Sequence, residues 1–158
     1  MIIENKNWFK NTFLLSILFI LLIFLLTVML EFYLSKFIGL GEPVVYDQSR
    51  VWGYSPKPNK KYERFEGDLV TINDAGLRST KSWKNETKPK LLFLGDSVLY
   101  GGSNINDDQL FSLLSRNDIP EWSCFNGGVN AFGILNMVAR SRFDKRIKDA
   151  DAVVFVFS

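Results

Sequence analysis

The feature that most constrains this chain is an uninterrupted apolar run close to its N-terminus. Residues 13–30 contain only two polar side chains, Ser16 and Thr27, and 15 of these 18 residues are Leu, Ile, Phe or Val. As a helix the run spans roughly 27 Å, and with residues 32–34 it covers a hydrocarbon core of about 30 Å. A buried core helix is the alternative, but the remaining 120 or so residues could hardly enclose one. We therefore expect a transmembrane anchor over residues 13–34.

The flanks of this run favour a permanent anchor over a cleaved signal peptide. The run exceeds the roughly 7–15 apolar residues of a signal-peptide core, and no small-x-small cleavage site follows it. Lys6 and Lys10 lie in the short tail of residues 1–12, while Lys36 and Arg50 follow the run, so the charge difference is small. We favour a cytoplasmic N-terminus. The expectation is a single-pass protein whose partner is the lipid bilayer and whose main domain lies outside, in the periplasm or extracellular space.

Composition excludes several classes of function. The chain has 158 residues, one Cys, no His and a net charge of +2. A single Cys excludes an internal disulfide and a Cys-only zinc site, and the missing His excludes a complete Ser-His-Asp triad within this polypeptide. A net charge this small gives no electrostatic support for nucleic-acid binding. We expect neither a metal ion nor another cofactor.

Beyond the anchor the pattern divides at about residue 90. Residues 35–90 are predicted to be a juxtamembrane segment of short strands and turns, including a turn at residues 73–76. Residues 91–158 alternate between apolar strand patterns at 91–94, 123–125 and 151–158 and helix patterns after Asn106 and from Ile134. This β-α-β-α-β order predicts an α/β fold with a parallel sheet and helices on both faces.

The helix predicted from Ile134 has a regular apolar spacing. Leu135, Ala139, Phe143 and Ile147 recur every four residues, which predicts that they face the core. The same pattern predicts that four charged residues lie on the opposite, solvent-facing side of the helix: Arg140, Asp144, Lys145 and Lys148.

The last predicted strand lies at the end of the 158 residues. A parallel strand is normally buried on both faces, and ligands bind beyond its carboxyl end, where no residue remains to form a loop. A compact three-stranded domain is one interpretation. We favour the other, in which residues 91–158 are the N-terminal half of a longer α/β domain truncated after its third strand.

Two glycine-containing loops carry the candidate chemistry. Gly95, Asp96 and Ser97 follow the first strand and precede Gly101, which places a serine hydroxyl where a nucleophile is often found. Residues 126–133 follow the second strand and are expected to lie beside the first loop. Ordinary turn and capping chemistry also explains Asp96 and Ser97. The serine is not in a Gly-x-Ser-x-Gly elbow, because Leu99 occupies the position of the second Gly.

Taken together, these segments resemble the SGNH (GDSL-type) hydrolase superfamily. Residues 91–97 with Gly101 are similar to its first block, Asn126-x-Gly128 to its second, and residues 73–78 to a segment that precedes the domain in membrane-anchored bacterial members. The resemblance covers about residues 45–158. It implies a flavodoxin-like α/β/α sandwich and ester chemistry, often the removal or transfer of acyl groups on envelope polysaccharides.

The resemblance also assigns roles to individual residues. Ser97 corresponds to the nucleophile, the amides of Ser97 and Gly128 to the oxyanion hole, and Gly95, Asp96, Gly101 and Asn126 to signature positions. The third block, with its oxyanion-hole Asn, and the Asp-x-x-His block that supplies the triad acid and base are both missing. A serine without a base is a poor nucleophile, so we expect the 158-residue polypeptide alone to be inactive or nearly so.

Three hypotheses remain open from the sequence. The first is an incomplete, inactive fragment of an envelope ester hydrolase or O-acyltransferase that acts on an acylated polysaccharide or another ester. The second is a non-catalytic, membrane-anchored binding or assembly protein, with a second chain completing its sheet. A nucleotide-binding flavodoxin-like module is the weakest of the three, because neither glycine loop has the spacing of a phosphate-binding loop.

Overall fold

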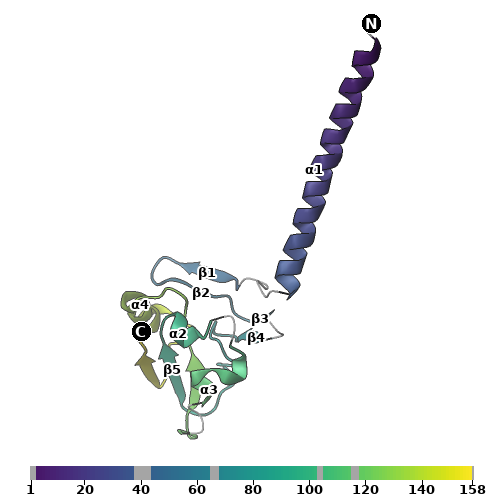
Figure 1. The fold of residues 1–158 in the computed structure, drawn as a ribbon. Coiled ribbons are helices and arrows are strands. Elements are labelled where there is room, and N and C mark those ends of the chain that lie inside the picture. The colour runs from purple at the N-terminus through teal and green to yellow at the C-terminus, as the bar shows by residue number, and fades with distance from the viewer. Residues whose placement is uncertain (1–2, 38–43, 65–67, 103–104, 115–117, 158) are drawn as a thin grey trace. The chain divides into compact units, whose positions relative to one another are not determined.

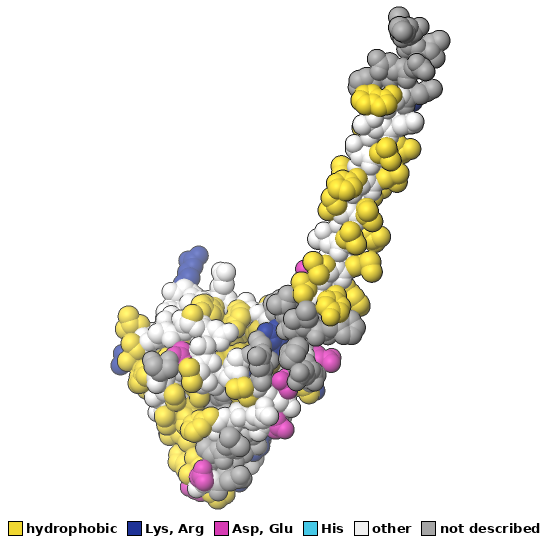
Figure 2. All heavy atoms as spheres, viewed as in Figure 1, with side chains coloured by type: hydrophobic (Ala, Val, Ile, Leu, Met, Phe, Trp, Pro, Cys, Tyr) yellow, Lys and Arg dark blue, Asp and Glu magenta, His cyan; other side chains and the backbone are white. Residues whose placement is uncertain are grey.

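The chain folds into two compact units, residues 1–40 and 41–158. The computed structural model describes residues 3–37, 44–64, 68–102, 105–114 and 118–157. In the first unit, helix α1 (Ile3–Phe37) forms because its central residues are almost all apolar. Its stretch from Lys10 to Ser35 is long and apolar enough to cross a membrane (Figure 1). Figure 2 shows the apolar side chains exposed along this helix, which contains the whole predicted anchor.

Two antiparallel hairpins begin the second unit. Strand β1 (Tyr46–Ser49) pairs with β2 (Gly53–Pro56), and β3 (Lys60–Glu63) pairs with β4 (Leu69–Ile72). The predicted turn after β4 is present: the amide of Gly76, at a φ of +75°, donates to the carbonyl oxygen of Asn73 at 3.1 Å. Glycine adopts such a positive φ without strain. The described part of this segment therefore has the short strands and turns that its sequence predicts.

The centre of the unit is the predicted parallel sheet. It consists of β5 (Lys90–Leu94), β6 (Ser123–Asn126) and β7 (Ala152–Phe155), in the order β6-β5-β7. Both pairings are parallel, with Leu92 opposite Phe125 on one side and Val153 on the other. The mixed α/β class and the parallel pairing are therefore confirmed.

Arg78 connects this sheet to the second hairpin. It forms isolated antiparallel bridges with Ile72 at the end of β4 and with Asn126 at the end of β6. The segment before residue 90 thus extends the sheet beyond β6, on the side opposite β7. Within the part of the chain that the structure describes, the outer edge of β7 is paired with no strand.

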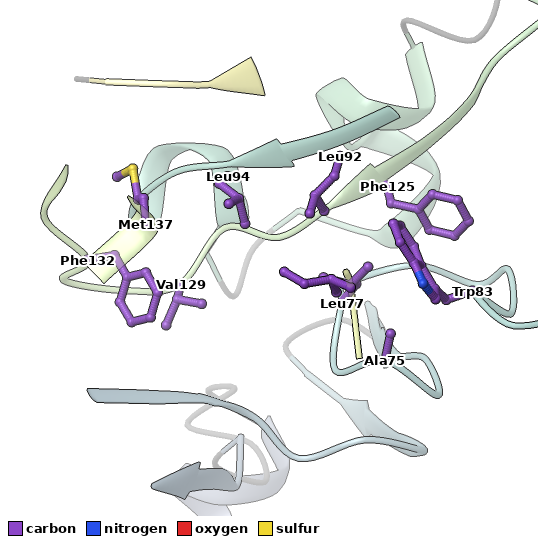
Figure 3. Close-up of a cluster of buried hydrophobic side chains, with 10 residues drawn as sticks. Ala75, Leu77, Trp83, Leu92, Leu94, Phe125, Val129, Phe132 and Met137 are labelled. Atoms are coloured by element: carbon purple, nitrogen blue, oxygen red, sulfur yellow. The ribbon is translucent and has the colours of Figure 1, made fainter. Parts of the chain in front are cut away.

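Side chains alternate along β5 between two apolar clusters. Leu92 and Leu94 join the larger cluster, in which Trp83 packs edge-on against Phe125 with ring centroids 4.7 Å apart (Figure 3). On the other face, Phe93 packs in a smaller cluster with Leu99 and Cys124. Residues from both sides of the predicted boundary at 90 share the larger cluster, which also contains Ala75, Leu77, Val129, Phe132, Met137 and Ile147.

Helices cover both faces of the sheet. Helix α2 (Ser97–Tyr100) contributes Leu99 to the smaller cluster, and α3 (Phe111–Leu114) lies on the same face, where Phe111 contacts Phe93. A 3-10 helix, η2 (Asp107–Gln109), precedes α3 and is capped by Asn106. Helix α4 (Ile134–Phe143) contributes Met137 to the larger cluster on the opposite face.

The predicted orientation of α4 is wrong. Leu135 and Phe143, expected in the core, are 81% and 59% exposed, whereas Met137 and Arg140 are buried. The helix also ends at Phe143, and the buried Ile147 lies in the turns that follow it. The inward face includes Arg140 as well as Met137, because the guanidinium bonds to the loop carbonyls of Gly127 and Gly76, which a periodicity argument does not anticipate.

Candidate active site

Ser97 lies at the carboxyl end of the central strand, where α2 begins. The side chain of Asp96 accepts a hydrogen bond from the amide of Val98 at 2.9 Å and so caps this short helix. At the other end, Gly101 adopts a φ of +87° and its amide donates to the carbonyl of Ser97 at 3.1 Å. Asp96 is therefore a cap whose carboxylate faces the helix amide, and the Ser97 side chain is exposed to solvent.

Gly95 is required by close packing at this strand-to-helix turn. A Cβ at this position would lie 2.8 Å from the Cβ of Leu99 and 3.2 Å from the carbonyl oxygen of Val156. Its own carbonyl oxygen accepts from the amide of Val129 at 3.0 Å. The turn before Ser97 is thus held against both neighbouring strand ends.

The second glycine loop lies directly against α2, as predicted. The side-chain amide of Asn126 donates to the carbonyl oxygen of Leu99 at 2.7 Å, and its oxygen accepts from the amide of Gly128 at 2.8 Å. A Cβ at Gly128 would come within 2.4 Å of the backbone nitrogen of Tyr100. The structure therefore brings together the six residues that the sequence singles out, namely Gly95, Asp96, Ser97, Gly101, Asn126 and Gly128.

The amide of Gly128 is already used inside the protein. Gly128 is buried, and its N–H donates to Asn126, so in this arrangement it does not point to an oxygen on a bound ester. Its assignment to an oxyanion hole stays a prediction. Asn126, by contrast, has a structural task that the resemblance does not specify: it fixes the distance between the two loops.

The hydroxyl of Ser97 has no hydrogen-bond partner among the described residues, and the sequence contains no His. A serine hydroxyl needs an adjacent base to attack an ester at neutral pH. The geometry therefore provides an accessible serine and a closely packed loop, but no base in the described part of the chain.

Arg78 supports the site, although no motif in the sequence marks it as a functional residue. Its buried guanidinium donates to the carbonyl oxygens of Tyr100 at 2.7 Å, of Gly102 at 2.9 Å and of Ile105, all in the segment after Ser97. Its Nε lies 3.3 Å from a carboxylate oxygen of Asp107. Arg78 thus holds the C-terminal end of α2 and the loop beyond it in place.

Arg140 plays the matching role under the second loop. Its guanidinium donates to the carbonyl oxygens of Gly127 and Gly76, both at 3.1 Å, and its Nε lies 3.4 Å from Asp144. Burial lowers its pKa to about 10, although the carboxylate of Asp144 acts in the opposite direction. In the sequence, each of these two arginines is simply a charged residue beside an apolar pattern. Such a residue is also typical of a solvent-facing position, so its burial is not indicated.

Comparison with known proteins identifies no relative. No family model, curated protein or solved structure matches the chain. Among the described residues there is also no group of three or more His, Cys, Asp or Glu side chains placed to hold a metal ion. The function is therefore inferred from the geometry of the two loops.

Proposed function

We propose that this chain is a membrane-anchored protein of the SGNH ester hydrolase or O-acyltransferase type, with Ser97 as the nucleophile and acylated envelope glycans as substrates. The observation that carries the proposal is the position of Ser97: it is exposed, at the carboxyl end of the central parallel strand, with the loop of Asn126 and Gly128 packed beside it. The strand order β6-β5-β7, which is second-first-third along the chain, supports the proposal, because a flavodoxin-like sheet has the order 2-1-3-4-5.

In this proposal the 158 residues provide the nucleophile but not the base. Loss of the triad serine or histidine costs roughly a millionfold in a serine protease, and the remaining interactions give only about 10³–10⁴ over water. Because the sequence has no His, an imidazole base would have to come from residues outside these 158. The polypeptide alone is then almost inactive as a hydrolase.

An acyl-enzyme experiment tests the role of Ser97. The full chain in detergent is incubated with p-nitrophenyl acetate, with and without added imidazole as a substitute base, and acetylated residues are located by mass spectrometry. We expect turnover near the background of Ser97→Ala without imidazole, and an imidazole-dependent acetyl group on Ser97 formed with release of p-nitrophenolate. Acetylation of Ser97 no faster than that of two other exposed hydroxyls, Thr80 and Thr87, would argue against the proposal.

The anchor is part of the same proposal. Helix α1 is long and apolar enough to span the bilayer, and the charges of the N-terminal tail favour a cytoplasmic N-terminus. The second unit is then on the outer side of the membrane, where acylated glycans are found. A cysteine-accessibility assay on a Ser49→Cys variant in intact cells tests this orientation: labelling by a membrane-impermeant maleimide supports it, and labelling only after lysis contradicts it.

A second candidate function is favoured by the free edge of β7. Val153 and Val154 are 37% and 40% exposed although they belong to a strand of the central sheet. An uncovered apolar edge readily pairs with another strand. This supports a non-catalytic assembly protein in which a second chain completes the sheet. If so, Val154→Lys abolishes association of the full chain in micelles, measured by light scattering, whereas Val51→Lys at an exposed turn leaves it unchanged.

A further inference from the structure

A lysine-lined hollow lies away from Ser97, between the second hairpin and the loop that follows Arg78. Its volume is about 550 Å³, within the range of small-molecule sites. Lys60 and Lys61 come from β3, and Lys81 and Lys84 come from the loop. The polar lining also includes four hydroxyl residues and three asparagines: Thr71, Ser79, Thr80, Ser82, Asn59, Asn73 and Asn85.

Positive charge is concentrated in this hollow. Four lysines and one acidic residue, Asp74, line it, so its formal charge is +4 − 1 = +3, whereas the whole chain carries +2. Lys81 lies 3.6 Å from Glu86. In the described part of the chain, no carboxylate lies within ion-pairing distance of Lys60, Lys61 or Lys84, so none of these three lysines is neutralised by an ion pair.

The one carboxylate in the hollow, Asp74, is bound within its own loop and forms no ion pair with a lysine among the described residues. Asp74 accepts from the amide of Trp83 at 2.7 Å, from the amide of Lys84 at 3.1 Å and from the hydroxyl of Ser82 at 3.0 Å. These bonds outweigh the effect of burial, and the pKa of Asp74 lies below its ordinary value. Asp74 is thus a fixed, ionised structural group that shapes the loop.

One backbone hydrogen bond and one side-chain hydrogen bond hold the two walls of the hollow together. The amide of Ser79 donates to the carbonyl oxygen of Thr71 at 3.0 Å, and the side chain of Asn73 donates to the carbonyl oxygen of Lys81, also at 3.0 Å. The lysine side chains are therefore presented from a scaffold that exists before any ligand arrives, which reduces the entropic cost of binding.

We propose that this hollow binds a phosphate group carried on a small polar molecule such as glycerol. Lysine ammonium groups recognise phosphate as point charges, and no arginine is among the described lining residues. The hydroxyls supply additional hydrogen bonds to phosphate or to the attached polyol. Two sources carry this chemistry: the headgroup of an anionic phospholipid and a soluble phosphate ester.

Lysine footprinting on the full chain tests the proposal and separates the two sources. The protein is placed in phosphatidylcholine nanodiscs, and acetylation of each lysine by an N-hydroxysuccinimide ester is followed by mass spectrometry. One arm adds glycerol 3-phosphate against sodium chloride of equal ionic strength; the other replaces part of the lipid with phosphatidylglycerol. We expect Lys60, Lys61 and Lys84 to react at least about threefold more slowly in one arm, while the exposed Lys145 and Lys148 are unaffected.

Each outcome of the footprint is decisive. Protection by glycerol 3-phosphate identifies a soluble ligand, and protection only with phosphatidylglycerol identifies the lipid headgroup. Absence of protection in both arms overturns the proposal. Equal slowing at Lys145 and Lys148 overturns it too, because that result indicates nonspecific attraction to a cationic protein.

Matched variants provide a second measurement in the arm that gives protection. Lys60→Gln/Lys61→Gln removes two of the ammonium groups and should weaken binding about tenfold or more, which corresponds to about 1.4 kcal/mol. Lys145→Gln/Lys148→Gln removes the same charge elsewhere and should change affinity less than about twofold. Lys60→Arg/Lys61→Arg should retain binding. Equal loss in the two glutamine variants would show that only net charge matters and would overturn the site.

Discussion

Asn126 donates its side-chain amide to the carbonyl oxygen of Leu99, 2.7 Å away, and so joins the loop after β6 to the helix that begins at Ser97. The same side chain accepts the amide of Gly128 at 2.8 Å. Since Asn126 is fully buried, both bonds are shielded from water. One side chain therefore sets the distance between the two loops of the candidate site.

Removing this side chain should destabilise the second unit. Asn126→Ala leaves the Leu99 carbonyl and the Gly128 amide buried without partners, and each such group costs about 1–3 kcal/mol, so we expect a loss of roughly 2–4 kcal/mol. Urea unfolding of the full chain in micelles, followed by tryptophan fluorescence, to which the buried Trp83 contributes, measures the change. Asn130→Ala, at an exposed position of the same loop, is the control and should change stability by less than about 0.5 kcal/mol. Equal effects of both variants would contradict this role of Asn126.

Adding one methyl group at Gly128 should displace α2. The new Cβ would lie 2.4 Å from the nitrogen and 2.8 Å from the Cα of Tyr100, and backbone atoms cannot move aside as a flexible side chain can. Overpacking typically costs about 1–3 kcal/mol, and we expect Gly128→Ala at the upper end of this range or beyond it. Gly133→Ala is the matched control, because its Cβ would meet only Asn136, at 3.7 Å. A thermal unfolding midpoint unchanged in both variants would show that the loops are not packed as described.

The order of the elements and the proximity of the two loops could be predicted from the sequence, for a simple reason. Residues 91–94 and 123–125 are short apolar runs, and the carboxyl ends of parallel strands meet at one edge of a sheet, which places Ser97 beside Asn126 and Gly128. The bond that occupies the Gly128 amide could not be predicted, since it depends on the rotamer of Asn126 rather than on spacing.

The face of α4 could not be predicted, because periodicity measures only hydrophobicity. Arg140 is directed inward by the carbonyl oxygens of Gly127 and Gly76, which are far apart in the sequence. Leu135 is exposed although its spacing is that of a core residue. A buried arginine compensated by distant backbone groups has no local sequence pattern, and this also explains why the role of Arg78 was missed.

Arg78 should not tolerate replacement by lysine. The guanidinium makes three bonds to backbone carbonyls and one to Asp107, a planar arrangement that a single ammonium group cannot reproduce. Arg78→Lys leaves buried acceptors and a buried carboxylate poorly paired, so we expect a loss of about 3 kcal/mol or more in the free energy of unfolding. Urea unfolding measures this loss. Arg142→Lys is the control, because the Arg142 side chain is exposed and its replacement should leave the free energy of unfolding unchanged. Full stability of Arg78→Lys would contradict the structural role of the guanidinium.

Asp144 should make stability depend on pH in the acid range. Burial raises the pKa of its carboxyl, but the hydrogen bond to Arg146 at 2.8 Å and the charges of Arg146 and Arg140 outweigh burial, so the pKa lies below the ordinary value of 3.8. A carboxyl whose pKa is lowered by folding stabilises the protein above its unfolded pKa, and this contribution is lost as the pH falls through the folded pKa.

Comparison of variants between pH 7 and pH 2 isolates this contribution. We expect the wild-type chain to lose stability below about pH 4. Asp144→Asn should be less stable at pH 7, because Arg140 loses its buried partner, and should show a smaller further loss on acidification. Asp108→Asn, at an exposed carboxylate, should follow the wild-type profile. If the stability of the wild type and of Asp144→Asn fell in parallel with decreasing pH, Asp144 would be excluded as the source of the acid-dependent loss.

Charges placed in the middle of α1 should prevent stable membrane insertion. Leu22 and Leu25 lie near the centre of the stretch from Lys10 to Ser35, and an arginine at a helix centre costs roughly 2.5–3.5 kcal/mol against insertion. Leu22→Arg/Leu25→Arg should therefore move the protein from the carbonate-resistant membrane fraction to the soluble or aggregated fraction. Leu22→Ile/Leu25→Ile, which keeps the apolar surface, should stay in the membrane, as should Val51→Arg in the second unit. Extraction of the wild-type chain by carbonate would contradict a membrane-spanning α1, because a spanning helix resists a treatment that releases surface-bound proteins.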